Sequence, residues 1–62
     1  MNISNYPIVN DYIKKLRGIK KSNSFDTRRR LRKEATELLG VMTSKASQVA
    51  VEIATTEGLY RA

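Results

Sequence analysis

Apolar residues at helical spacing are the feature that most limits what this chain can fold into. In three segments they recur every third or fourth position, the period of one face of an α-helix rather than of a β-strand. The three sets are Ile8, Val9, Tyr12, Ile13, Leu16 and Ile19; Leu31, Ala35, Leu38 and Leu39; and Ala46, Val49, Ala50 and Ile53. Since no segment shows strand-like alternation or an internal repeat, we expect an all-α protein.

Capping signals indicate where the helices begin and end. Asn5 fits the cap of the first helix, and Pro7 fits its first turn, where the missing N–H has no helical partner. Gly18 suits the C-terminal end of this helix. The expected helices span about residues 6–17, 27–39 and 44–56, and they form a single domain over residues 1–62.

The start of the second expected helix carries its own signals. Either Asp26 or Thr27 fits its cap. Phe25, just before the cap, is placed to pack onto a later apolar residue such as Leu31. We therefore expect this aromatic side chain to form a hydrophobic staple at the start of the helix.

Gly40 allows two interpretations of residues 31–53. In the first, the helix runs on through the glycine at a cost of about 1 kcal/mol relative to alanine. The fold is then an N-terminal helix plus one long helix in an oligomer. In the second, the chain turns after Gly40, which takes a backbone angle that residues with a Cβ resist, and Thr43 or Ser44 caps a third helix. The second gives a small three-helix domain, and it is the prediction we adopt.

The segment from Arg32 to Val51 resembles the helix-turn-helix signature of bacterial and phage regulators. In that family a glycine opens the turn, a small residue lies four positions earlier, and apolar residues occupy fixed positions on both sides. Here those positions hold Gly40, Thr36, Ala35, Leu39, Val41, Ala46 and Val49. Thr36 departs from the commoner alanine. The resemblance covers about a third of the chain and implies a DNA-binding domain.

The resemblance also implies which residues contact DNA. The N-terminal half of the third helix would enter the major groove, where Gln48 can make a bidentate contact with adenine. The predicted base-contacting residues are Thr43, Ser44, Lys45, Ser47 and Gln48. One of the two hydroxyl residues that begin this set is also expected to cap the helix. The residues expected in the core or an oligomer interface are Leu39, Met42, Ala46, Val49, Ala50 and Ile53.

Positive charge is concentrated in one half of the chain. The sequence has 12 Lys and Arg against 6 Asp and Glu, a net charge of +6, and ten of the cations lie between Lys14 and Lys33 with only Asp26 among them. Such a cluster attracts a polyanion, most often nucleic acid, although a solvated face is the alternative interpretation. The predicted phosphate-contacting residues are Lys20, Lys21, Arg28, Arg29, Arg30, Arg32 and Lys33.

The residues for catalysis or metal binding are scarce. The chain has no cysteine and no histidine, which removes thiol nucleophiles, imidazole acid–base chemistry and the usual zinc ligands. No paired carboxylates or glycine-rich phosphate loop occur, so we expect no enzyme, cofactor, metal or small-molecule substrate. The stretches "YPIVNDYIKKLR" and "LRKEATELL" look like the opening helices of uracil phosphoribosyltransferases. That family's phosphoribosyl-pyrophosphate loop is absent here, so we do not expect its activity.

The expected location and partners follow from these features. No apolar run approaches the ~18 residues of a membrane span and no signal-peptide pattern is present. We therefore expect a cytoplasmic protein, nucleoid-associated or in the host cytoplasm if viral. We expect a phage- or plasmid-type transcription regulator that binds double-stranded DNA as a homodimer, through residues 49–60 or the apolar face of the first helix. The alternative is a helical module that oligomerises or binds and modulates another regulator or enzyme through the face between Met42 and Ile53.

Overall fold

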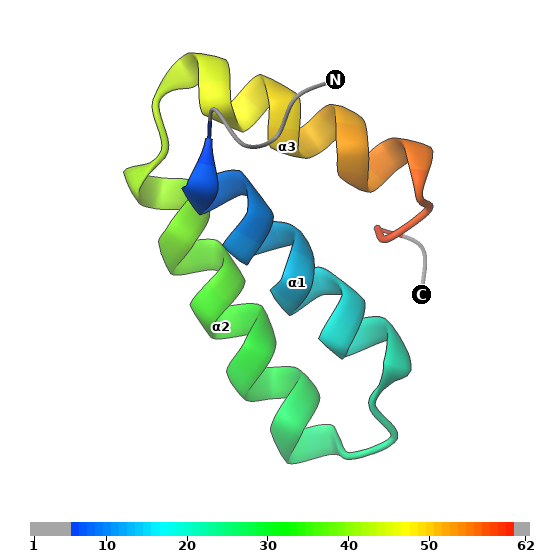
Figure 1. Cartoon of the computed structure of the whole chain (residues 1–62). Helices are drawn as coiled ribbons and strands as arrows, with labels where there is room; N and C mark the ends of the chain where they lie inside the picture. Colours follow the sequence, from blue (N-terminus) through cyan, green and yellow to red (C-terminus); the bar gives the residue numbers. More distant parts are fainter. Residues whose placement is uncertain (1–5, 61–62) are drawn as a thin grey trace.

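The computed structural model describes residues 6–60, and these residues form three helices and no strand (Figure 1). Helix α1 spans Pro7–Lys21, α2 spans Phe25–Val41 and α3 spans Ser44–Thr56. The first two lie antiparallel, and α3 crosses the end where α2 finishes and α1 begins. The prediction of a small all-α three-helix domain is confirmed. The alternative of one long helix after α1 is wrong, because the chain turns between α2 and α3.

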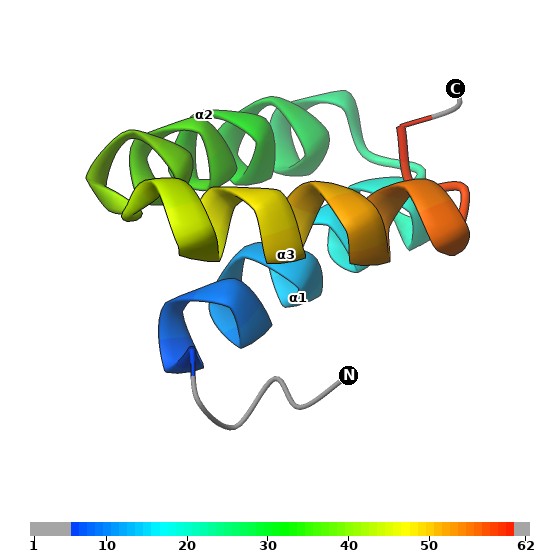
Figure 2. The same cartoon turned by 90° about the horizontal axis from the view of Figure 1, so that it is seen from above.

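Helix α1 is the centre of the core. It packs against both other helices, which diverge from their shared turn in Figure 1. In the view of Figure 2, α1 lies below them. The buried residues are Val9, Tyr12, Ile13 and Leu16 from α1, Ala35 from α2, and Ala46, Ala50 and Ala54 from α3. The apolar face of α1 is thus covered within one chain. It is therefore not free to serve as the dimer surface that the sequence suggested.

Helix α3 meets α1 through a stripe of alanines. Ala46, Ala50 and Ala54 recur every four residues and are at most 2% exposed. Their methyl groups are short, so the α3 backbone can approach α1 closely. Val49 and Ile53 flank the stripe and are half-buried, as are Leu39 and Met42 from α2 and the turn. All six predicted core residues therefore belong to the core or pack against it.

Helix α1 is longer at its C-terminal end than the sequence predicts. It continues past Arg17 to Lys21, with Gly18 inside the helix. A Cβ on Gly18 would lie 2.9 Å from Cδ1 of Leu31 in α2, so this glycine permits close packing instead of ending the helix. Pro7 occupies the first turn as predicted, and Tyr6 is the N-cap without a side-chain hydrogen bond. The predicted cap Asn5 lies outside the described residues.

Helix α2 begins two residues earlier than predicted. Its cap is Ser24, whose Oγ accepts a hydrogen bond from the Thr27 N–H at 3.4 Å, so the prediction of Asp26 or Thr27 is wrong. Phe25 is the first helical residue and is 74% exposed. It therefore does not pack onto Leu31, and the prediction of a hydrophobic staple is wrong as well.

The break between α2 and α3 falls after Gly40. The helix runs through Gly40 to Val41, and the only glycine with a positive φ among residues 6–60 is Gly58, at 68°. Met42 and Thr43 are extended, and the Thr43 Oγ1 accepts a hydrogen bond from the Ala46 N–H at 3.2 Å. Helix α3 thus begins where predicted, but the capping threonine ends the turn and Gly40 is not its hinge.

Gly40→Ala should therefore stabilise the domain. A Cβ at this position meets nothing within 4 Å, and alanine is favoured over glycine in a helix by about 0.5–1 kcal/mol. We expect a rise of this size in the free energy of unfolding, measured by urea denaturation. Gly58→Ala is the control and should destabilise, because its φ of 68° is strained for alanine. A loss of stability in Gly40→Ala would restore the hinge interpretation.

Candidate nucleic-acid interface

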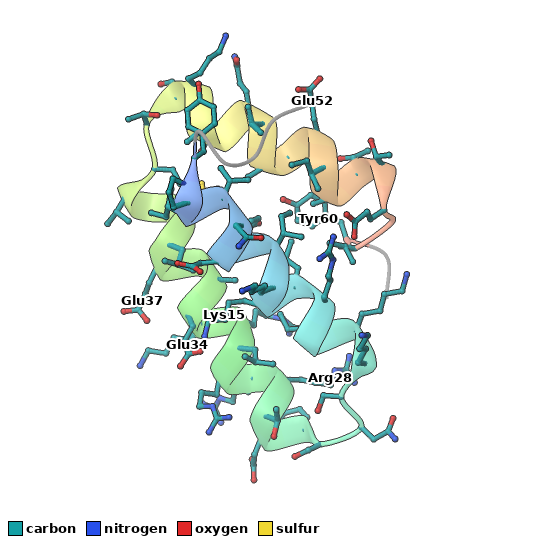
Figure 3. The ribbon with its side chains drawn as sticks, in the orientation of Figure 1. Lys15, Arg28, Glu34, Glu37, Glu52 and Tyr60 are labelled. Carbon is teal, nitrogen blue, oxygen red and sulfur yellow. The ribbon has the colours of Figure 1, made fainter. Side chains whose placement is uncertain are left out.

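Seven exposed cations occupy the last turn of α1 and the first half of α2. They are the predicted phosphate-contacting residues, Lys20, Lys21, Arg28, Arg29, Arg30, Arg32 and Lys33. Figure 3 shows Arg28 at the end of the molecule where α1 finishes and α2 begins. Within residues 6–60 the ion pairs join other groups, Lys15 with Glu34 at 3.0 Å and Arg17 with Glu57 at 2.7 Å. The seven side chains are thus free of internal ion pairs in the described part of the chain.

The charges on α2 run against its macrodipole. Arg28, Arg29 and Arg30 lie close to the N-terminus, which carries partial positive charge, and Asp26 is the only acid in the first turn. The last turn, where cations are favoured, has no basic residue. The arrangement lowers the stability of the isolated helix. These arginines therefore do not stabilise α2 through its dipole.

An open groove of about 780 Å³ borders the same cations. Its lining comes from α1, from residues 28–39 of α2 and from the turn at residues 58–60. We call the α1 side its floor and the other two sides its walls. Lys20, Arg28 and Arg32 line it together with apolar side chains from all three parts. We call this feature the basic groove.

Two polar contacts hold the C-terminal wall of the basic groove against α1. The Tyr12 and Tyr60 hydroxyls share a hydrogen bond of 2.9 Å, and the Arg17 guanidinium donates two hydrogen bonds to the Glu57 carboxylate at 2.9 and 2.7 Å. Burial, and then the bond with Tyr60, raise the pKa of the Tyr12 phenol. The bonds from Arg17 lower the pKa of Glu57. The Tyr12 phenol is therefore neutral at physiological pH and the Glu57 carboxylate is charged, the states these contacts require.

The predicted base-contacting residues surround the start of α3. Ser44, Lys45 and Gln48 are exposed and Ser47 is half-buried. Thr43 is exposed, but its oxygen caps α3, so this residue is the cap expected from the pair at the start of the set. These positions can reach a partner surface, and the hydroxyl of Thr43 still has a proton to donate.

The outward face of α3 carries little positive charge. Lys45 is its one cation among Ser44–Thr56, and Glu52 lies one turn beyond Gln48. Figure 3 shows Glu52 directed away from α1 and α2. Ser47, Gln48, Val51 and Glu52 border a shallow hollow on this face. The positive potential of the described surface therefore comes mainly from α1 and α2.

The two predicted sets lie at opposite ends of α2. From Arg28 to Val41 the helix rises roughly 20 Å, at 1.5 Å per residue. The structure therefore does not bring the arginines and the start of α3 into one compact site. Only a ligand with a long surface can touch both sets at once.

Several residues of this region have no signal in the sequence. The Tyr12–Tyr60 and Arg17–Glu57 contacts join residues 48 and 40 positions apart, so no local sequence pattern predicts either pair. The recurrence of arginine at positions 28 and 32 does place two cations on one helical face. That spacing is a usable signal for a basic stripe, but the opposite wall of the groove cannot be inferred from it.

Comparison with protein-family models, with curated proteins and with solved structures finds no match to this chain. Over residues 6–60, none of the helices has the length and apolar character needed to cross a membrane. The site must therefore be interpreted from its own geometry and charge.

Proposed function

We propose that this chain binds double-stranded DNA, as a small transcription regulator of the phage or plasmid type. The observation that carries the proposal is the set of seven exposed cations that form no ion pair within residues 6–60, three of them placed against the macrodipole of α2. Phosphate groups would compensate these charges, and release of counterions would drive binding. The cations thus serve to hold the duplex without reading its sequence.

Sequence reading is assigned to the start of α3. Its exposed residues Ser44, Lys45 and Gln48 have the side chains that contact base edges in the major groove. The separation of roughly 20 Å along α2 suits a duplex, whose phosphates continue along the backbone on both sides of the groove. The longest dimension of the described chain is 32 Å, about one turn of DNA. Two copies on two half-sites would supply specificity beyond that footprint.

A second candidate is a helical module that binds another protein. The near-neutral outward face of α3, with Glu52 next to Gln48 and Val51 44% exposed, suits a protein surface better than phosphate. The cations would then contact an acidic protein patch. This candidate requires no DNA binding.

Binding to an unrelated duplex across a range of salt tests the DNA proposal. With about six phosphate contacts we expect a loss of affinity on the order of a thousandfold between about 50 and 200 mM salt, measured by fluorescence anisotropy. After a preferred sequence is selected from a random duplex library, Gln48→Ala should relax that preference. Arg29→Ala should weaken binding to duplexes of every sequence about equally. Absence of binding at low salt would overturn the proposal and leave the protein-binding candidate.

A further inference from the structure

The basic groove has an apolar floor that nothing in the described chain covers. Leu16 lies at its base, and Ile19, Leu39 and Leu59 are half-buried and line it from three different segments. The groove volume of about 780 Å³ falls within the range of small-molecule sites in proteins. Apolar surface of this concave shape gains free energy when an apolar group displaces its water.

The charged groups of the groove are all of one sign. Its lining includes Lys20, Arg28 and Arg32 but no aspartate or glutamate. Arg28 and Arg32 lie one helical turn apart on the same side of α2, where two like charges repel. An anion placed beside both guanidinium groups would remove that repulsion and accept charge-assisted hydrogen bonds.

Most neutral polar side chains of the groove already have partners. The Tyr12 and Tyr60 hydroxyls bond to each other, and the Thr36 hydroxyl donates to the Arg32 carbonyl oxygen at 2.9 Å. The groups left to recognise a ligand are therefore the three cations, the Asn23 amide at the edge of the groove and the apolar floor. This pairing selects a molecule with one anionic end and one apolar end.

We propose that the basic groove binds a single-chain amphiphilic anion, with its phosphate or carboxylate head among Lys20, Arg28 and Arg32 and its apolar tail on Leu16, Ile19, Leu39 and Leu59. The occupant is a free monomer and not a lipid in a bilayer, because a flat membrane surface cannot reach a floor that lies between two walls. The proposal goes beyond DNA binding and does not depend on it. Since the three cations are also predicted phosphate contacts, the amphiphile and DNA would exclude each other.

Titration with monomeric octyl phosphate and octanoate, followed by backbone amide shifts in NMR spectra, tests the proposal. We expect saturable binding at one site, with shifts confined to residues 12–23, 28–39 and 58–60. Inorganic phosphate and octanol should each bind far more weakly. Shortening the tail should weaken binding by up to about fourfold for each methylene removed.

Charge variants identify the head-group site. Arg28→Gln with Arg32→Gln should raise the Kd for octyl phosphate about tenfold, the lower end for hydrogen bonds to charged groups. The matched control is Arg30→Gln, which removes the same charge from an exposed position outside the groove lining and should change the Kd less than about twofold. Arg30→Gln should still weaken DNA binding, so failure of one proposal is distinguishable from failure of the other.

Three results would overturn the amphiphile proposal. These are equal Kd values for the double variant and Arg30→Gln, affinity independent of tail length, and binding to vesicles of anionic lipid without binding to monomeric octyl phosphate. All three arginines are exposed, so we expect their substitution to leave the fold intact. Far-ultraviolet circular dichroism of each variant should be unchanged.

Discussion

Replacing Arg28, Arg29, Arg30 and Arg32 together with glutamine should weaken binding to duplex DNA about a thousandfold at about 0.1 M salt. Each phosphate contact that is lost removes about 0.9 from the slope of log affinity against log salt, so the slope should fall by about four. The four side chains are exposed and make no ion pair within residues 6–60, so little else changes. Fluorescence anisotropy across a salt series measures both quantities.

The same variant should be at least as stable as the original chain. Its substitutions remove cations from the positive end of the α2 macrodipole, where each cation costs about 0.3–1 kcal/mol. Lys14→Gln is the control, because Lys14 is exposed on α1 outside the predicted contact set, and it should weaken DNA binding only slightly. If the variant with four substitutions keeps its affinity for DNA, the arginines form a solvated face and the proposed interface is wrong.

Ile13→Ala should remove most or all of the stability of the domain. Ile13 is 1% exposed and is, with Val9, the largest fully buried side chain, in the helix that contacts both others. Truncation of a buried isoleucine costs about 2–5 kcal/mol. A core in a chain of this size supplies little more than about 3–5 kcal/mol, so the variant should be largely unfolded.

Thermal and urea denaturation followed by circular dichroism measure this effect. Val51→Ala is a suitable control, since it also trims a β-branched residue in a helix but at a position 44% exposed. It should change the free energy of unfolding by less than about 0.5 kcal/mol. Equal effects of the two substitutions would mean that α1 is not the centre of the core.

The helical class and the core faces were predictable because they depend on local periodicity. Ile13 and Ala50 recur with their neighbours at helical spacing, and both are buried. Helix ends were less predictable where two signals lie close together. Gly40 and Thr43 are three residues apart, and the sequence alone does not show which one ends α2. The glycine tolerates helix at a modest cost, whereas the threonine cap supplies a hydrogen bond that starts α3.

Gly18 shows a second limit of sequence reasoning. A glycine followed by basic residues is typical of a helix end, yet α1 continues through it to Lys21. The reason is tertiary, because Leu31 of α2 fills the space that a Cβ would take. Such a contact depends on how two helices pack, which no local pattern specifies.

In the candidate site, too, the local features could be predicted from the sequence and the tertiary ones could not. That the arginines of α2 are exposed could be predicted from their charge, and the structure confirms it. The basic groove could not be predicted, because its walls come from α2 and from the turn that carries Leu59 and Tyr60. The turn reaches its place through the Tyr12–Tyr60 and Arg17–Glu57 contacts, between residues far apart in the sequence.

The alanine stripe of α3 has a consequence for how this helix can change. Ala46, Ala50 and Ala54 attach it to α1 through methyl groups, so larger side chains at these positions would force the helices apart. The outward positions Lys45, Gln48 and Glu52 are exposed and do not belong to the core cluster, so they can be exchanged without repacking the core. The packed face and the exposed face of helix α3 can therefore change independently of each other. Its exposed face can acquire a new binding preference by substitution while its attachment to the scaffold stays the same.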